Sequence, residues 1–153
     1  MTSTFTAAPA FKDAFVGIVE SLNAGTAVEV AFGHPGMTQA EEIISIGDIT
    51  SEQEPAAFGS RRPREETLTL TVYVNVFRGG GEESEKVCSD RAYALLGAIE
   101  EYVRVTDTTV GNTVRACFMT SHASVGSTDP QVLASGRMID ITAVFTAVTR
   151  ITS

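Results

Sequence analysis

The sequence is poor in the residues from which disulfide scaffolds and metal sites are most often built. It has two cysteines and two histidines among 153 residues. Cys88 and Cys117 can form at most one bridge, which is too few for the framework of a small disulfide-rich secreted domain. We therefore expect two buried or half-buried thiols in a reducing compartment, with a Cys88–Cys117 disulfide as the less favoured alternative.

Positive charge is also scarce. Eleven lysines and arginines stand against nineteen aspartates and glutamates, which gives a formal net charge of −8 and a pI near 4.7. A general nucleic-acid binder needs a cationic face that displaces counterions from phosphates, and docking on anionic lipid needs the same. The charge balance argues against both classes.

Long hydrophobic runs are missing as well. The longest apolar-leaning stretch, residues 141–149, contains threonines and is far shorter than the roughly 18 residues of a membrane span. The first six residues show no cationic region followed by an apolar one, so we expect no signal peptide. With 43% hydrophobic and 20% charged residues, the composition is nevertheless that of a folded chain, and the length favours a single domain over residues 1–153.

The spacing of apolar residues predicts the first elements. Phe11, Phe15, Ile18 and Leu22 recur at helical spacing, and a short alternating strand follows over residues 28–32. A Gly-His-Pro-Gly turn at residues 33–36 then leads to a strand over 42–49. From about residue 50 to 65 we expect a long loop, and loops of that length in compact domains are usually functional or disordered.

The clearest strand covers residues 66–78 and would be roughly 40 Å long, about twice the usual length. Its predicted inner face carries Leu68, Leu70, Val72, Val74 and Val76, and its outer face carries Thr67, Thr69, Thr71, Tyr73, Asn75 and Phe77.

The second half of the chain predicts a helix over residues 83–104 and two strands over 113–125 and 132–151, the last interrupted near 135–136. The helix would bury a broad stripe made of Val87, Arg91, Ala94, Leu95, Ala98, Ile99 and Tyr102, widened by Ala92, Leu96 and Val103. The order α-β-β-β-α-β-β predicts an α+β fold: a mainly antiparallel sheet of about five strands with both helices packed on one face.

The material for a catalytic or metal site is thin. Ser121, His122 and Asp129 could suggest a hydrolytic triad, but there is no Gly-x-Ser-x-Gly turn, and neighbouring strand residues point to opposite faces. No Cys or His pair has metal-ligand spacing. The glycines at 79–81 lack the signatures of a phosphate loop. We therefore expect no enzyme activity, no catalytic residue, no cofactor and no metal.

Two features point instead to a partner surface. The outer face of the long strand has no charge before Arg78, as in interface cores that are depleted in charge and enriched in aromatics, although threonine is also simply a good strand former. A basic cluster lies at the end of the expected loop. It would form an ionic contact with an acidic partner or a solvated loop neutralised by Glu65 and Glu66. The candidate interface residues are Arg61, Arg62, Arg64, Thr69, Thr71, Tyr73 and Phe77.

The order and spacing of several segments resemble a known family. They are Gly33–Gly36, Glu41–Ile44, Ile46–Ile49, Phe58–Glu66 leading into the long strand, Gly79–Gly81, Arg91–Leu96, Ile99–Glu101, Asp107–Gly111 and Gly136–Ile141. Together they resemble the tail terminator proteins of long-tailed, siphovirus-like bacteriophages, especially those of actinobacteria. That resemblance covers most of the chain. It implies a small α+β subunit of a six-membered ring that caps the tail tube, stops its polymerisation and joins it to the head.

The resemblance also implies the partners and the setting. They are further copies of the chain in a homohexamer, the tail tube protein and a head-side connector protein, in a virion tail or neck assembled in the host bacterial cytoplasm without a membrane. Genome DNA would pass through the ring without specific binding, which suits an acidic subunit. The alternatives are another head–tail connector or neck protein, a tail tube subunit, and, outside virion assembly, a small bacterial ligand-binding or hydrolase domain.

Overall fold

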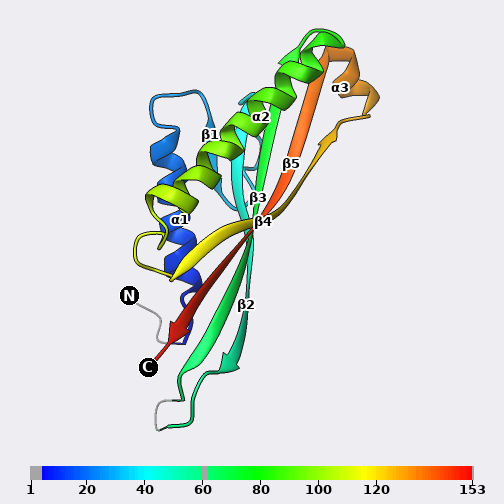
Figure 1. Cartoon of the computed structure of the whole chain (residues 1–153). Helices are drawn as coiled ribbons and strands as arrows, with labels where there is room; N and C mark the ends of the chain where they lie inside the picture. The colour runs from blue at the N-terminus through cyan, green and yellow to red at the C-terminus, as the bar shows by residue number, and fades with distance from the viewer. Residues whose placement is uncertain (1–4, 60–61, 153) are drawn as a thin grey trace.

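The computed structural model describes residues 5–59 and 62–152. Within them, α-helices lie on one side of a single five-stranded sheet (Figure 1). The elements in chain order are α1 (Ala8–Leu22), β1 (Glu29–Phe32), β2 (Glu42–Pro55), β3 (Arg64–Gly79), α2 (Glu83–Glu101), the π-helical turn η1 (Tyr102–Thr106), β4 (Ala116–Gly126), α3 (Pro130–Ser135) and β5 (Gly136–Ile151). None of these helices is both long and apolar enough to cross a bilayer.

The strand order across the sheet is β1-β2-β3-β5-β4. The β2–β3, β3–β5 and β4–β5 pairs are antiparallel, whereas β1 and β2 run parallel, with Phe32 opposite Ile46. The two strands are parallel because the connection at residues 33–41 brings the chain back to the end of the sheet where β1 begins, so that β2 runs in the same direction as β1. The predicted α+β fold with a mainly antiparallel sheet is confirmed, with one parallel pair making the sheet mixed.

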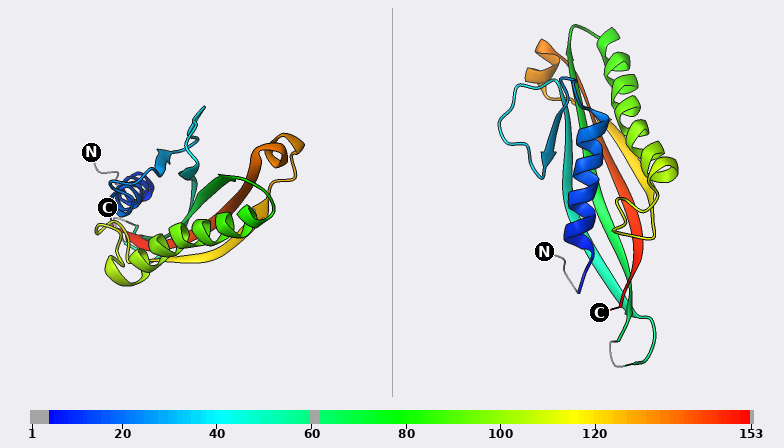
Figure 2. Two further views of the ribbon diagram at one scale, coloured as in Figure 1. Left: turned by 90° about the horizontal axis from the view of Figure 1, so that it is seen from above. Right: turned by 90° about the vertical axis from the view of Figure 1, so that its left-hand side faces the viewer.

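The core lies between the sheet and the helices α1 and α2. The inner face predicted for the long strand is confirmed, since all five of its residues from Leu68 to Val76 are fully buried. Helix α1 lies along the strands (Figure 2) and buries Phe11, Phe15 and Val19. The Phe15 ring meets Phe145 of β5 edge to face, with 5.0 Å between ring centroids. Burial of each such side chain stabilises the fold by about 1.5–3 kcal/mol.

Helix α2, continued by η1, buries the edge of the predicted stripe that contains Ala92, Leu96 and Val103, while Ala94 and Ala98 near its centre are exposed. Its buried residues are Ser84, Cys88, Ala92, Leu95, Leu96 and Ile99, while the Val87 side chain is 53% exposed. Apolar residues occupy neighbouring positions on this helix, such as Val87 beside Cys88, so its apolar pattern sets the orientation only weakly. The buried Ser84 satisfies its hydroxyl by donating to the Gly79 carbonyl at 2.9 Å.

The expected loop at about residues 50 to 65 is wrong over about half of its length. Strand β2 continues to Pro55, and the antiparallel register runs on from Ser51 opposite Leu68 to Pro55 opposite Arg64. The residues between are polar and lack an apolar alternation, but backbone pairing needs none. A register shift between Ile46 and Ile49 marks a bulge in the same strand. Only residues 56–63 connect the two strands, in a hairpin that projects beyond the helices (Figure 1).

The expected strand over residues 132–151 begins later than predicted. Residues Pro130–Ser135 form the short helix α3, and β5 starts at Gly136. Proline suits a first helical position, and the Asp129 carboxylate caps the helix by accepting a hydrogen bond from the Gln131 amide at 2.9 Å. These local signals outweigh the apolar residues that suggested a strand.

Candidate functional site

The sheet face turned away from α1 and α2 carries an uncharged band. The band consists of three rows of cross-strand pairs between β3 and β5: Thr69 with Thr146, Thr71 with Val144, and Tyr73 with Thr142. Phe118 of β4 continues the first row and is 54% exposed, and Tyr73 is 44% exposed. A sheet face exposed to water usually carries charge, whereas this band combines hydroxyls with exposed aromatic rings, as interface cores do.

The residues predicted for this face lie on it. Thr69, Thr71 and Tyr73 form the β3 side of the uncharged band, and Phe77 lies further along the same strand opposite Met138. Phe77 is only partly accessible, because its ring packs over Gly136, where an added Cβ would lie 2.8 Å from the Phe77 Cζ atom. Phe77 therefore packs within the subunit, Thr69 and Thr71 are likewise only partly accessible, and Tyr73 is the most exposed of the four.

A cleft of about 480 Å³ adjoins the uncharged band under the segment that connects β1 to β2. Its lining consists of Gly33, His34, Pro35, Ile43, Ser45, Gly47, Asp48, Tyr73, Asn75 and Asp140. The Tyr73 ring forms the floor beside Gly47. Two carboxylates, Asp48 and Asp140, belong to the lining, and the Asn75 side-chain amide donates a hydrogen bond to Asp140.

Sequence reasoning missed this cleft as a site. The segments that line it are the β1–β2 connection, the bulge after Ile46, and the facing positions of β3 and β5. They are up to about 100 residues apart in the chain, and only the parallel pairing of β1 with β2 brings them together. The turn signal at Gly33–Gly36 was visible in the sequence, but its position over the sheet face was not.

The hairpin tip is the second surface feature, formed by Pro55, Ala57, Phe58, Gly59, Arg62 and Arg64 around a hollow of about 540 Å³. The Phe58 side chain is fully exposed. Of the predicted basic cluster, Arg61 lies outside the described residues. Arg62 is exposed in a left-handed backbone conformation with φ of 44°. Arg64 is partly buried, and its Nε donates to the Gln53 Oε1 at 2.8 Å.

Glu66 does not neutralise the tip arginines in solvent as one alternative expected, since its side chain is 1% exposed. The carboxylate accepts hydrogen bonds from the Ala7 amide at 2.8 Å, from the hydroxyls of Thr6 and Ser51, and from the Gln53 amide at 3.0 Å. Burial is the largest single influence and raises the pKa of Glu66, but the four hydrogen bonds together outweigh it and hold the pKa below its ordinary value. This network fastens the start of α1 to the base of the hairpin.

Glu65 lies on the opposite face and pairs with Arg115 at 2.5 Å and with Arg150 at 3.0 Å. Its partners lie on β5 and in the segment before β4. Among the described residues, neither carboxylate therefore forms an ion pair with Arg62 or Arg64. Their carboxylates are engaged elsewhere in the fold.

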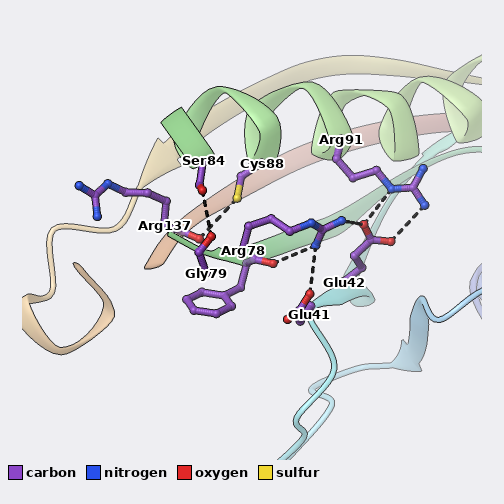
Figure 3. A network of polar contacts seen from close by, with 9 residues as sticks. Glu41, Glu42, Arg78, Gly79, Ser84, Cys88, Arg91 and Arg137 are labelled. Carbon is purple, nitrogen blue, oxygen red and sulfur yellow. Dashed lines mark hydrogen bonds and ion pairs between the residues drawn. The ribbon is translucent and has the colours of Figure 1, made fainter. Parts of the chain in front are cut away.

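A second polar network joins α2 to the sheet (Figure 3). Arg91 binds the Glu42 carboxylate with both Nε, at 2.8 Å, and Nη2, at 3.0 Å, and Arg78 binds the same group. Arg78 also contacts Glu41 at 3.6 Å. The hydrogen bonds from Arg91 are the largest influence on the pKa of Glu42; burial opposes them, Arg78 reinforces them, and the pKa lies below its ordinary value. The network is internally satisfied and braces the scaffold.

The residues considered for catalysis form no reactive arrangement in the described part of the chain. His122 packs edge to face on Tyr93 of α2, with 5.5 Å between ring centroids. Cys88 and Cys117 are free and buried. Burial raises the pKa of both thiols, that of Cys117 to about 12, so neither is a ready nucleophile. Among residues 5–59 and 62–152 no group of three or more His, Cys, Asp or Glu side chains is placed to hold a metal ion.

Comparison with known proteins gives a structural likeness. The sequence matches no established family and no curated protein. A chain of the solved structure described as "Virion of native gene transfer agent (GTA) particle" is similar to this one, with 14% identity, a TM-score of 0.48, and coverage of 94% of this chain and 98% of that chain. At this identity and TM-score the likeness does not assign a function.

Proposed function

We propose that this protein is a non-enzymatic structural subunit of a phage-type virion, and specifically a ring-forming tail terminator. In that role it caps the tail tube, stops tube polymerisation and joins the tail to the head-side connector. The observation that carries the assembly role is the uncharged band on the open sheet face, where Tyr73 and Phe118 expose aromatic rings beside threonines. The resemblance of the sequence to tail terminators supplies the particular role.

The arrangement of surfaces supports a ring. A ring of identical subunits uses two different surfaces per subunit, one for each neighbour, and a capping ring needs further surfaces for the tube and for the head side. The chain offers the uncharged band with its adjoining cleft at one place and the hairpin tip at another. We propose a homohexamer in the tail or neck of the particle, assembled in the cytoplasm of the host bacterium.

The charge of the subunit suits a ring around DNA. With a net charge of −8, a lumen lined by such subunits would let a duplex pass without gripping it, because counterion-release binding needs basic residues. Genome DNA would therefore pass through this ring without binding to it specifically.

A different neck protein or a tail tube subunit is the competing assembly role. Head-to-tail contacts that fail to close produce filaments instead of rings. Electron microscopy of the purified protein separates the two, because a terminator forms closed rings and a tube subunit forms filaments. Labelling of the chain along the length of the tube would overturn the terminator role.

Disruption of the gene in the particle that carries it tests the function directly. Overlong tails, or tails without heads, are expected, and a plasmid copy of the wild-type gene restores tails of normal length. Particles with normal-length tails joined to heads would contradict the proposal. Particles that lack a tube altogether would point to a tube subunit.

A further inference from the structure

The hairpin tip presents an aromatic ring and a cation to solvent. Phe58 is fully exposed, and Arg62 is exposed on the same hollow. Aromatic residues and arginine are the side chains most enriched where interfaces bury their strongest contacts. The Phe58 aromatic ring and the Arg62 guanidinium line the same hollow on a projecting hairpin. Such a pair of side chains can insert into a pocket on another molecule.

The cleft on the open sheet face has the complementary chemistry. Ile43, Pro35 and the Tyr73 ring supply apolar walls, and its charged lining residues are Asp48 and Asp140, both negative and both exposed. Its volume of about 480 Å³ is sufficient for an aromatic side chain and part of a guanidinium. Paired charges of opposite sign at the edge of an apolar pocket fix the register of a contact.

The tip cannot fill the cleft of its own subunit. Arg64, at the base of the tip, and Tyr73, in the cleft, are nine residues apart on strand β3, which places them up to roughly 30 Å apart. The connection between β2 and β3 also lies at the end of the sheet away from β1 (Figure 1). A contact between the two surfaces therefore joins two copies, and because the surfaces differ it is of the head-to-tail kind that builds rings.

From this complementarity, and resting on the proposed function as a self-assembling subunit, we infer that the hairpin tip of one copy seats in the cleft of the next copy. Phe58 enters between Ile43 and Tyr73, and Arg62 lies against Asp48 and Asp140. The uncharged band, which adjoins the cleft, is then covered by the same neighbour. Each subunit uses its tip toward one neighbour and its cleft toward the other.

Directed disulfide formation tests the contact. A Phe58→Cys variant and a His34→Cys variant are prepared separately, since both positions are exposed and His34 lines the cleft. The native Cys88 and Cys117 are buried and contribute little background. Under mild oxidation a mixture of the two variants is expected to give a covalent dimer that contains one copy of each. Dimers of Phe58→Cys with itself would indicate a two-fold contact and overturn the inference.

Charge reversal gives an independent test in solution. Arg62→Glu, or Asp48→Lys together with Asp140→Lys, is expected to weaken self-association at least tenfold by analytical ultracentrifugation. Combining the reversals on both sides restores it in part. Lys86→Glu is the matched control, because Lys86 is 82% exposed on α2, away from both surfaces. Self-association unchanged by all of these reversals would overturn the inference.

The outcomes separate the contact from the function. A wild-type chain that stays monomeric up to its solubility limit overturns the contact between copies. If the protein forms closed rings and caps tails normally but the mixed cross-link does not form, the inferred contact is overturned and the terminator role stands. A mixed cross-link in a protein whose gene disruption leaves tail length normal supports the contact and overturns the function. If Phe58→Ala abolishes binding to the tail tube but leaves self-association unchanged, the tip contacts the tube, and the inferred contact between copies is overturned.

Discussion

The ring of Tyr73 lies over Gly47, and the fit leaves no room for a side chain on the glycine. A Cβ added at Gly47 would lie 2.7 Å from the Tyr73 Cε2 atom and 3.1 Å from the Thr71 carbonyl oxygen. Gly47 follows Ile46 in the bulge of β2, so the bulge and the glycine together let the Tyr73 ring settle against the sheet and form the floor of the cleft.

We expect Gly47→Ala to destabilise the protein by about 1–3 kcal/mol, because the ring and the backbone must both shift to admit a methyl group. Thermal unfolding followed by circular dichroism measures the change. Gly17→Ala is the matched control: Gly17 lies within α1 with open space around it, and alanine there favours the helix. A Gly47→Ala variant as stable as the wild type would show that the Tyr73 ring is not held against the glycine.

Because of Glu66, we expect the free energy of unfolding to fall in acid. Its pKa is lower in the folded chain than its ordinary value of 4.5. The resulting stabilisation is fully present above about pH 4.5 and is lost as the pH falls through the folded pKa. Glu66→Gln is therefore expected to lower the free energy of unfolding by about 1–3 kcal/mol at neutral pH and to flatten its decline in acid. Urea unfolding across this pH range checks both effects, and an unchanged acid decline would contradict the assigned network.

The matched control for Glu66 is its neighbour in sequence. Glu65→Gln alters a carboxylate that is partly exposed and paired with Arg115 and Arg150 on the surface. Exposed pairs of this kind contribute little, so a smaller loss of stability is expected. Equal effects of the two substitutions would argue against the buried role of Glu66.

Arg91→Ala removes one of the two cations that hold Glu42. The carboxylate is nearly buried and keeps only Arg78, so the pKa of Glu42 is expected to rise and the free energy of unfolding to fall by about 1–3 kcal/mol. Titration of Glu42 by nuclear magnetic resonance and urea unfolding measure the two effects. Arg104→Ala serves for comparison, since the Arg104–Glu100 pair lies on the surface and its loss should change stability little.

The two cysteines are expected to be unreactive toward thiol reagents in the folded protein. Both are buried, and burial raises the pKa of Cys117 to about 12. Ellman's reagent should detect close to no thiol in native protein and both thiols in guanidinium chloride. Rapid reaction of either cysteine in native protein would show that its helix or strand opens readily.

The Cys117→Ser variant is expected to have a free energy of unfolding lower by about 1–3 kcal/mol, because a buried hydroxyl without a hydrogen-bond partner is costly.

Much of the fold was predictable because its signals are local and periodic. The strict alternation from Leu68 to Val76 predicts a half-buried strand, and the structure confirms both the strand and its inner face. The end of β2 was not predictable, because Ser51 to Pro55 are polar and are held by pairing with a strand that follows in the chain. The side of the α2 stripe that is buried was also missed, since Val87 and Cys88 are both apolar and only packing against β3 and β5 selects between them.

By itself, the sequence determined the α+β class, the long strand and the uncharged outer face with Thr69, Thr71 and Tyr73, because each follows from composition and a repeat of two or 3.6 residues. Only the tertiary structure decided that Glu66 is buried under the start of α1, and that His34, Asp48 and Asp140 meet around Tyr73. These are contacts between segments far apart in the chain. The cleft contacts depend on the parallel pairing of β1 with β2 and on the bulge after Ile46, and the Glu66 contacts depend on the packing of residues 6 and 7 against β2 and β3. No local pattern in the sequence carries a signal for either.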